Sequence, residues 1–254
     1  MAYSLSVHGY LFLLAAGLSA GLINSVAGGG SFLTFPTLVF IGVPSVVANA
    51  TSTVALFPGV FASSWAYRND FERLEKVPLK PAILVSIAGG IAGALLLLFT
   101  AQRTFDVIIP WILLMATVAL AAGPKISRML NSRVRISSRT LILLQFLCAI
   151  YGGYFGGAVG IIMLAVWSMA GLTDVHAMNA GRTLLGGVMN AAAVVCFVIA
   201  GKVWWLQAVL LLIAAVIGGY AGAHFAKRVN PALIRGVIIA ISAAVTVAFF
   251  VRGA

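Results

Sequence analysis

The sequence predicts an all-α, polytopic membrane protein made of two inverted repeats of about five helical segments each. Three observations predict this fold class. The 254 residues are 62% hydrophobic and 8% charged, whereas soluble domains carry about 25% charged residues. Apolar stretches of helix length follow one another along the chain. Motifs of the first half also recur in the second half at a nearly constant spacing.

The recurring motifs are small and polar residues that keep both their identity and their order. Gly30, Asn49, Ala50 and Thr53 recur 130 residues later as Gly160, Asn179, Ala180 and Thr183. Gly89-Gly90 and Gly93-Ala94 recur 129 residues later as Gly218-Gly219 and Gly222-Ala223. Internal duplication in a very apolar chain is typical of transporters, whose substrate site lies at the interface of the repeats.

The helical segments follow from the apolar runs. In the first repeat we expect them at about 9–27, 32–43, 45–66, 81–99 and 105–123, and in the second at about 140–157, 158–172, 176–200, 203–223 and 232–251. Segments 32–43 and 158–172 are shorter than the ~20 residues of a full crossing, so we expect half-helices or parts of re-entrant hairpins. The chain thus divides into a first repeat (1–123), a cytoplasmic linker (124–139) and a second repeat (140–254).

The basic residues set the orientation. The net charge is +11, and most Lys and Arg residues fall in three interhelical stretches, 67–80, 124–139 and 224–235. Basic loops stay on the cytoplasmic side, which places both termini outside and predicts a multi-pass membrane protein. An odd number of segments per repeat also inverts the second repeat. No basic domain stands apart from the apolar segments, so nucleic acid is not an expected partner.

Two glycine runs interrupt the apolar pattern near the start of each repeat. Consecutive glycines destabilise a helix, and broken helices at matching places in two repeats indicate a binding site. We expect the broken backbone to offer free N–H groups at Gly28, Gly29, Gly30, Gly156 and Gly157. The Gly89/Gly93 and Gly218/Gly222 pairs have the spacing that lets two helices approach closely.

The helix after each short segment carries the candidate site. Asn179, Arg182, Thr183 and Asn190 share one face of segment 176–200, and the matching face of the first repeat carries Asn49, Ser52 and Thr53. A charged residue at membrane depth usually faces a polar interior; alternatively, Arg182 extends to the headgroups. A guanidinium suits oxyanions, and the Asn amides and Thr hydroxyls add neutral donors. Carboxylates that could hold a cation are nearly absent from the apolar segments.

Asp174 and His176 precede this helix and have two readings. Asp174 can be the helix N-cap beside an exposed His176, or the two can form a proton-responsive pair next to the site. No nucleophile–base set, phosphate loop or metal cluster occurs, so we expect neither an enzyme nor a cofactor. A passive anion channel and a membrane-embedded assembly subunit are the alternative functions.

Together these motifs resemble the sulfite exporter TauE/SafE family, also called the toluene sulfonate uptake permease family. The resemblance rests on Gly21, residues 27–30, Pro36, residues 48–52, residues 151–160, residues 179–183, Asn190 and residues 201–204. It implies an inner-membrane secondary carrier of small anions, mostly sulfur-containing ones such as sulfite, sulfonates or sulfoacetate. The second glycine run is interrupted by Ala158-Val159, so only the substrate class is implied. The expected partners are that anion, the bilayer and a proton as candidate coupling ion; transport direction and oligomeric state are left open.

Overall fold

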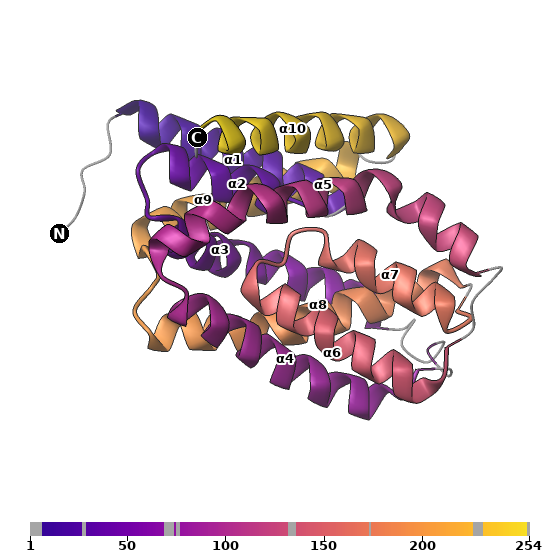
Figure 1. Cartoon of the computed structure of the whole chain (residues 1–254). Coiled ribbons are helices and arrows are strands. Elements are labelled where there is room, and N and C mark those ends of the chain that lie inside the picture. The colour runs from indigo at the N-terminus through magenta and orange to yellow at the C-terminus, as the bar shows by residue number, and fades with distance from the viewer. Residues whose placement is uncertain are drawn as a thin grey trace. The chain divides into compact units, whose positions relative to one another are not determined.

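The computed structural model describes residues 7–26, 29–68, 74, 77–131, 136–172, 174–225 and 231–252. Within these residues the chain forms ten α-helices and no strand (Figure 1). They are α1 (Val7–Val26), α2 (Ser31–Phe40), α3 (Ser45–Ala66), α4 (Leu79–Phe99), α5 (Gln102–Asn131), α6 (Ser138–Tyr154), α7 (Val159–Met169), α8 (Val175–Ile199), α9 (Trp205–Phe225) and α10 (Pro231–Arg252). The predicted all-α class is therefore confirmed.

The helices follow the predicted segments closely, with one exception at the linker. We expected the fifth segment to end at 123, but α5 continues through Pro124 to Asn131. The apolar run marks where a helix leaves the hydrocarbon, and the backbone hydrogen bonds that define the helix do not require apolar side chains. Proline removes only one of these bonds. The start of the predicted linker is therefore helical, and residues 132–135 lie outside the described residues.

The two short segments are half-helices. α2 has 10 residues and α7 has 11, which at ~1.5 Å per residue gives roughly 15 Å each, half of the ~30 Å hydrocarbon core. Each follows a glycine-containing break in which the backbone takes positive φ, at Gly29 (+101°) in the first repeat and at Gly156 (+78°) in the second. The predicted interruption of the helices is confirmed at both places.

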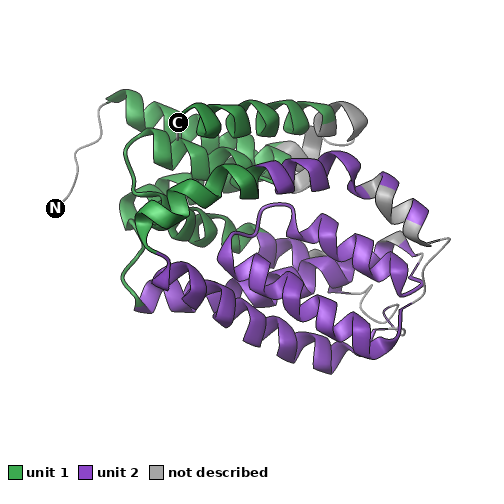
Figure 2. Ribbon diagram, viewed as in Figure 1, with its two compact units in different colours: residues 1–59, 101–113, 200–254 green, residues 60–100, 114–199 purple. Residues whose placement is uncertain are grey.

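The helices form two compact units, shown in green and purple in Figure 2. Unit 1 comprises residues 1–59, 101–113 and 200–254, and unit 2 comprises residues 60–100 and 114–199. Each unit therefore combines helices of both sequence repeats: α9 and α10 join α1 and α2, while α4 joins α6, α7 and α8. The division into inverted repeats stays a prediction about the sequence.

In unit 1 the main contact is between α1 and α9, and α10 packs against α2. The α1–α9 seam depends on glycine. A Cβ on Gly21 would lie 2.0 Å from the carbonyl oxygen of Ala215, and one on Gly218 would lie 2.0 Å from the carbonyl oxygen of Leu18. No side chain fits at either position, so the two backbones can touch only because both residues are glycine.

In unit 2 the corresponding contact is between α4 and α6, and α8 packs on α4. A Cβ on Gly93 would lie 2.1 Å from the carbonyl oxygen of Ile150, and one on Gly89 would lie 2.8 Å from that of Phe146. The predicted close packing at Gly89, Gly93 and Gly218 is thus confirmed, and the side-chain surroundings of Gly222 lie outside the described part of the chain.

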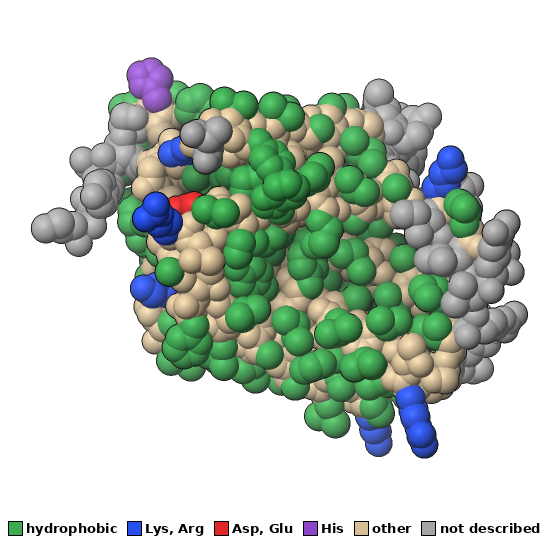
Figure 3. Space-filling view, viewed as in Figure 1, with side chains coloured by type: hydrophobic (Ala, Val, Ile, Leu, Met, Phe, Trp, Pro, Cys, Tyr) green, Lys and Arg blue, Asp and Glu red, His purple; other side chains and the backbone are tan. Residues whose placement is uncertain are grey.

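The helix surfaces suit a lipid environment. In the described residues, five helices are long and apolar enough to cross a membrane: α1, α3, α4, α5 and α8. Large apolar side chains such as Phe99, Trp111 and Ile199 are well exposed. Figure 3 shows hydrophobic side chains over most of the visible face, with Lys and Arg at its margins. Because water does not tolerate so much exposed apolar surface, these faces contact lipid.

Candidate functional site

The second glycine break sits between α6 and α7 in unit 2. Gly156 and Ala158 both have positive φ, +78° and +59°. Alanine rarely adopts this left-handed conformation, so the turn must be held in place by its surroundings. The hydroxyl of Tyr151 donates a hydrogen bond of 2.6 Å to the carbonyl oxygen of Gly157. The break is therefore a defined turn, and it fixes where α7 begins.

Arg182 lies directly over the first turn of α7. Its Cδ and Cγ atoms would be only 2.7 and 3.0 Å from a Cβ on Gly160, the second residue of that helix. The side chain can take this path only because residue 160 has no side chain. Arg182 is partly buried and lies among residues of unit 2.

The same face of α8 combines polar groups with open space. Asn179 and Asn190 are half-buried, and neither side-chain amide hydrogen-bonds to another described residue. Gly186 lies one turn from Arg182 and one turn from Asn190. It is buried, yet a Cβ added to it would meet no atom within 4 Å. The space beside Gly186 would therefore accept at least a methyl group.

The hydroxyls of the two equivalent threonines are directed into their own helices. Thr183 donates to the carbonyl oxygens of Asn179 at 3.0 Å and Ala180 at 2.9 Å. Thr53 donates to the carbonyl oxygen of Asn49 at 2.9 Å. Each hydroxyl hydrogen is thus used within the helix, and a ligand would meet its oxygen lone pairs rather than a donor.

The first glycine break, in unit 1, is closed by an asparagine. The N–H of Gly30 donates a 2.8 Å hydrogen bond to Oδ1 of Asn24, and a Cβ on Gly30 would lie 2.7 Å from Nδ2 of the same side chain. The Asn24 side chain therefore packs against Gly30, as the Arg182 side chain packs against the equivalent Gly160. Gly29 is half-buried, and Gly28 lies outside the described residues.

The α3 face predicted for the site is buried and largely hydrogen-bonded. Ser52, which is 2% exposed, shares a 2.6 Å hydrogen bond with the hydroxyl of Thr34 in α2. Thr51 accepts a 3.0 Å hydrogen bond from the backbone N–H of Trp204. Asn49 is 3% exposed. These groups tie α2 and α9 to α3, so in unit 1 the polar face serves the packing of the unit.

Asp174 is the N-cap of α8. Its Oδ1 accepts hydrogen bonds from the backbone N–H of His176 at 2.8 Å and of Ala177 at 3.3 Å, and both Asp174 and His176 are exposed. These hydrogen bonds match the predicted role of Asp174 as the helix N-cap. A proton-coupling role for the pair stays a prediction.

The predicted site residues thus fall into two groups. Unit 2 brings together Asn179, Arg182, Thr183, Asn190 and the Gly156–Gly160 turn, and unit 1 holds Asn49, Ser52, Thr53 and the Gly29–Gly30 turn. That both groups line one site stays a prediction. Sequence reasoning missed Asn24, Thr34 and Tyr151. Only Asn24 carried a signal, as a polar residue in an apolar segment just before a glycine run. The described residues contain no cluster of three metal-ligating side chains.

Comparisons with known proteins agree with this picture. The Sulfite exporter TauE/SafE family matches residues 13–249. A probable membrane transporter protein, ORF9, from Sinorhizobium sp. is 28% identical over 96% of this chain and 93% of its own length. The probable membrane transporter protein YfcA of Escherichia coli K12 is 27% identical over 92% and 86%, and one from Haemophilus influenzae is 25% identical over 91% and 90%. The chain therefore belongs to the sulfite exporter TauE/SafE family and is a membrane transporter.

Proposed function

We propose that this protein is a secondary carrier that moves small sulfur-containing oxyanions, such as sulfite or a short sulfonate, across the inner membrane. Arg182 would bind the anion at the first turn of α7. The polar face of α8 would complete the site in unit 2.

The observation that carries the proposal is the position of Arg182 over Gly160. The first turn of a helix carries a partial positive charge. At the start of α7 the N–H groups of Val159 and Ile161 donate to the carbonyl oxygens of Gly156 and Ala158, and no hydrogen bond from the N–H of Gly160 to a described residue is found. A guanidinium beside such a turn faces charge of its own sign, and in a partly buried place this is unfavourable. An anion bound between the two would satisfy both, as it does at anion-binding helix N-termini.

The surroundings support a small, oxygen-rich ligand. The side-chain amides of Asn179 and Asn190 can donate from the same face of α8. A sulfite or sulfonate group presents several oxygens to a guanidinium, which binds such groups through two parallel hydrogen bonds. The family description supports sulfur as the central atom; the three relatives' names specify membrane transport without a substrate.

Flux measurements in proteoliposomes test the proposal. Radiolabelled sulfite and a C2 sulfonate should enter with saturable kinetics and show accelerated exchange when unlabelled anion is present on the opposite side. We expect Arg182→Ala to reduce this flux more than tenfold, since a charged hydrogen bond contributes roughly 1.5–3 kcal/mol. The matched control is Arg139→Ala, which removes an exposed arginine at the start of α6 in the same unit.

Two results would refute the proposal. Wild-type flux in Arg182→Ala would remove the anion-binding role of this residue. Ohmic single-channel currents without counter-substrate exchange would identify a passive anion channel instead of a carrier.

A further inference from the structure

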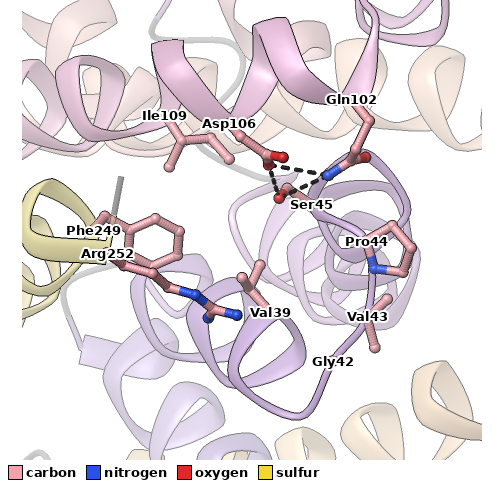
Figure 4. A pocket seen from close by; sticks show the side chains of 10 residues that line it. All are labelled: Val39, Gly42, Val43, Pro44, Ser45, Gln102, Asp106, Ile109, Phe249 and Arg252. Atoms are coloured by element: carbon pink, nitrogen blue, oxygen red, sulfur yellow. Dashed lines mark hydrogen bonds between the residues drawn. The ribbon is translucent and has the colours of Figure 1, made fainter. Parts of the chain in front are cut away.

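A polar cavity that opens to the surface lies in unit 1, away from the residues considered so far, and its Gln102, Asp106 and Arg252 side chains are exposed. It has a volume of about 320 Å³ and lies where the α2–α3 turn, the start of α5 and the end of α10 meet. Val39, Val43, Ile109 and Phe249 form apolar walls, while Ser45, Gln102, Asp106 and Arg252 supply polar groups (Figure 4). In the predicted topology this is the outer end of the unit. Binding pockets for small molecules begin at about 300 Å³.

One wall holds a carboxylate in a fixed position. Asp106 Oδ1 accepts hydrogen bonds from the hydroxyl of Ser45 and, at 3.0 Å, from the side-chain amide of Gln102. The same amide donates to the Ser45 hydroxyl at 3.0 Å, and its oxygen accepts from the backbone N–H of Val46 at 3.2 Å. No hydrogen bond to Oδ2 of Asp106 is found in the described part of the chain.

The other wall holds a cation that does not pair with this carboxylate. Arg252 enters from the end of α10 and reaches toward Val39, across the cavity from Asp106 (Figure 4). Its guanidinium carbon lies 5.7 Å from the centre of the Phe40 ring, a cation–π contact. Among the described residues no ion pair joins Asp106 and Arg252. The cavity therefore presents a negative and a positive group on separate walls.

This charge arrangement selects one chemical class of ligand. A simple anion would be attracted by Arg252 and repelled by Asp106, and a simple cation would experience the reverse. A zwitterion can satisfy both groups at once, with its ammonium at Asp106 and its acidic group at Arg252. The apolar surface formed by Ile109, which is fully buried, and Phe249, which is 6% exposed, suits the short carbon chain between them.

We propose that this cavity is a binding site for a small zwitterion, such as an amino acid whose ammonium and acidic groups are separated by a few carbons. The site is independent of the proposed anion transport, because all of its residues belong to unit 1 and Arg182 belongs to unit 2.

Ligand binding to the purified full-length protein in detergent tests this site. Glycine, β-alanine and γ-aminobutyrate would be compared by calorimetry or saturation-transfer NMR with propionate and propylamine, which carry only one of the two charges. We expect one of the zwitterions to bind at least tenfold more tightly than either singly charged probe, because a charged hydrogen bond contributes roughly one tenfold step or more.

Four variants make the result specific. Asp106→Asn and Arg252→Gln should each weaken zwitterion binding about tenfold, and Asp106→Asn should also abolish the preference for β-alanine over propionate. Arg103→Gln is the matched control, since Arg103 is exposed on α5, the helix that carries Asp106, and does not line the cavity. Arg182→Ala should bind the zwitterion as wild type does, whether or not it transports anions.

The proposal is overturned if propionate binds as tightly as the zwitterions and Asp106→Asn binds them unchanged, which would indicate an anion site formed by Arg252 alone. It is equally overturned if none of the zwitterions binds to wild-type protein with a Kd below about 10 mM while the protein's thermal unfolding shows that it is folded. Asp106→Asn can lose the preference for β-alanine over propionate only if it is folded and still binds these probes. A misfolded variant would bind neither probe and so could not produce this result.

Discussion

A single methyl group at Gly160 should disable the anion site without changing any charge. In Gly160→Ala the new Cβ would lie 2.7 Å from Cδ and 3.0 Å from Cγ of Arg182. Carbon atoms prefer separations of about 3.5–4.0 Å, so the arginine stem must retreat by roughly 0.8 Å or change rotamer. A displaced guanidinium loses hydrogen bonds to its ligand, and each is worth roughly 1.5–3 kcal/mol, or tenfold to a hundredfold in affinity.

Saturable anion flux in proteoliposomes measures this effect, together with thermal unfolding in detergent. We expect the half-saturating concentration to rise at least tenfold for Gly160→Ala, while stability is maintained, because alanine is the better helix former by about 1 kcal/mol. Gly236→Ala in α10 is the matched control, since its methyl meets no atom within 4 Å and residue 236 is not part of the proposed site. Unchanged flux kinetics in Gly160→Ala, or an equal loss in Gly236→Ala, would show that the position of Arg182 does not matter for transport.

Three further predictions concern the framework. Gly21→Ala puts a methyl 2.0 Å from a carbonyl oxygen of α9 and should destabilise the protein by about 1–3 kcal/mol. This loss would be measured as a lower unfolding temperature in detergent. Gly59→Ala, whose methyl has no neighbour within 4 Å, should not lower the unfolding temperature. Asn24→Ala leaves the Gly30 N–H without its acceptor and should cost about 1–3 kcal/mol by the same measurement, whereas Asn24→Asp keeps the acceptor. Asp174→Ala should cost about 1 kcal/mol through the lost helix cap, and Asp174→Asn should restore most of it; a shifted pH profile of flux in Asp174→Asn would support proton coupling beyond the cap.

The helices could be predicted from the sequence because hydrophobicity in a membrane protein reports directly on the spanning segments. Nine of the ten segments begin and end within about four residues of the predicted bounds. The glycine seams could also be predicted, because small residues four apart have few roles other than close packing. The extension of α5 beyond Gly123 could not, since it depends on backbone hydrogen bonding outside the apolar run.

The partners of the helices were harder to predict than the helices themselves. Nothing in the apolar pattern specifies that α1 packs on α9 and α6 on α4, because apolar faces are equally compatible with many neighbours. That exchange of partners between repeats is what a two-fold relation between them would produce, and it divides each compact unit between both halves of the sequence. The contacts at the site were equally hidden. The role of Tyr151 depends on a turn that only the folded backbone defines, and that of Thr34 depends on Ser52 in another helix.

The two repeats differ in a way that matters for function at one matched pair of glycines, Gly30 and Gly160. Gly30 and Gly160 occupy equivalent places at the start of α2 and α7. The sequence alone therefore gives no reason to expect different roles for them. In the structure the first is contacted by Asn24, which accepts its N–H, and the second is covered by the stem of Arg182. A neutral amide satisfies a helix N-terminus, whereas a cation leaves it in need of negative charge. Both breaks are hydrogen-bonded within the protein, since the N–H of Gly156, expected to be free, donates to the carbonyl oxygen of Tyr151 at 3.1 Å. Only the second break places a cation over the helix that follows, so under the proposed function we expect the anion to bind at the start of α7.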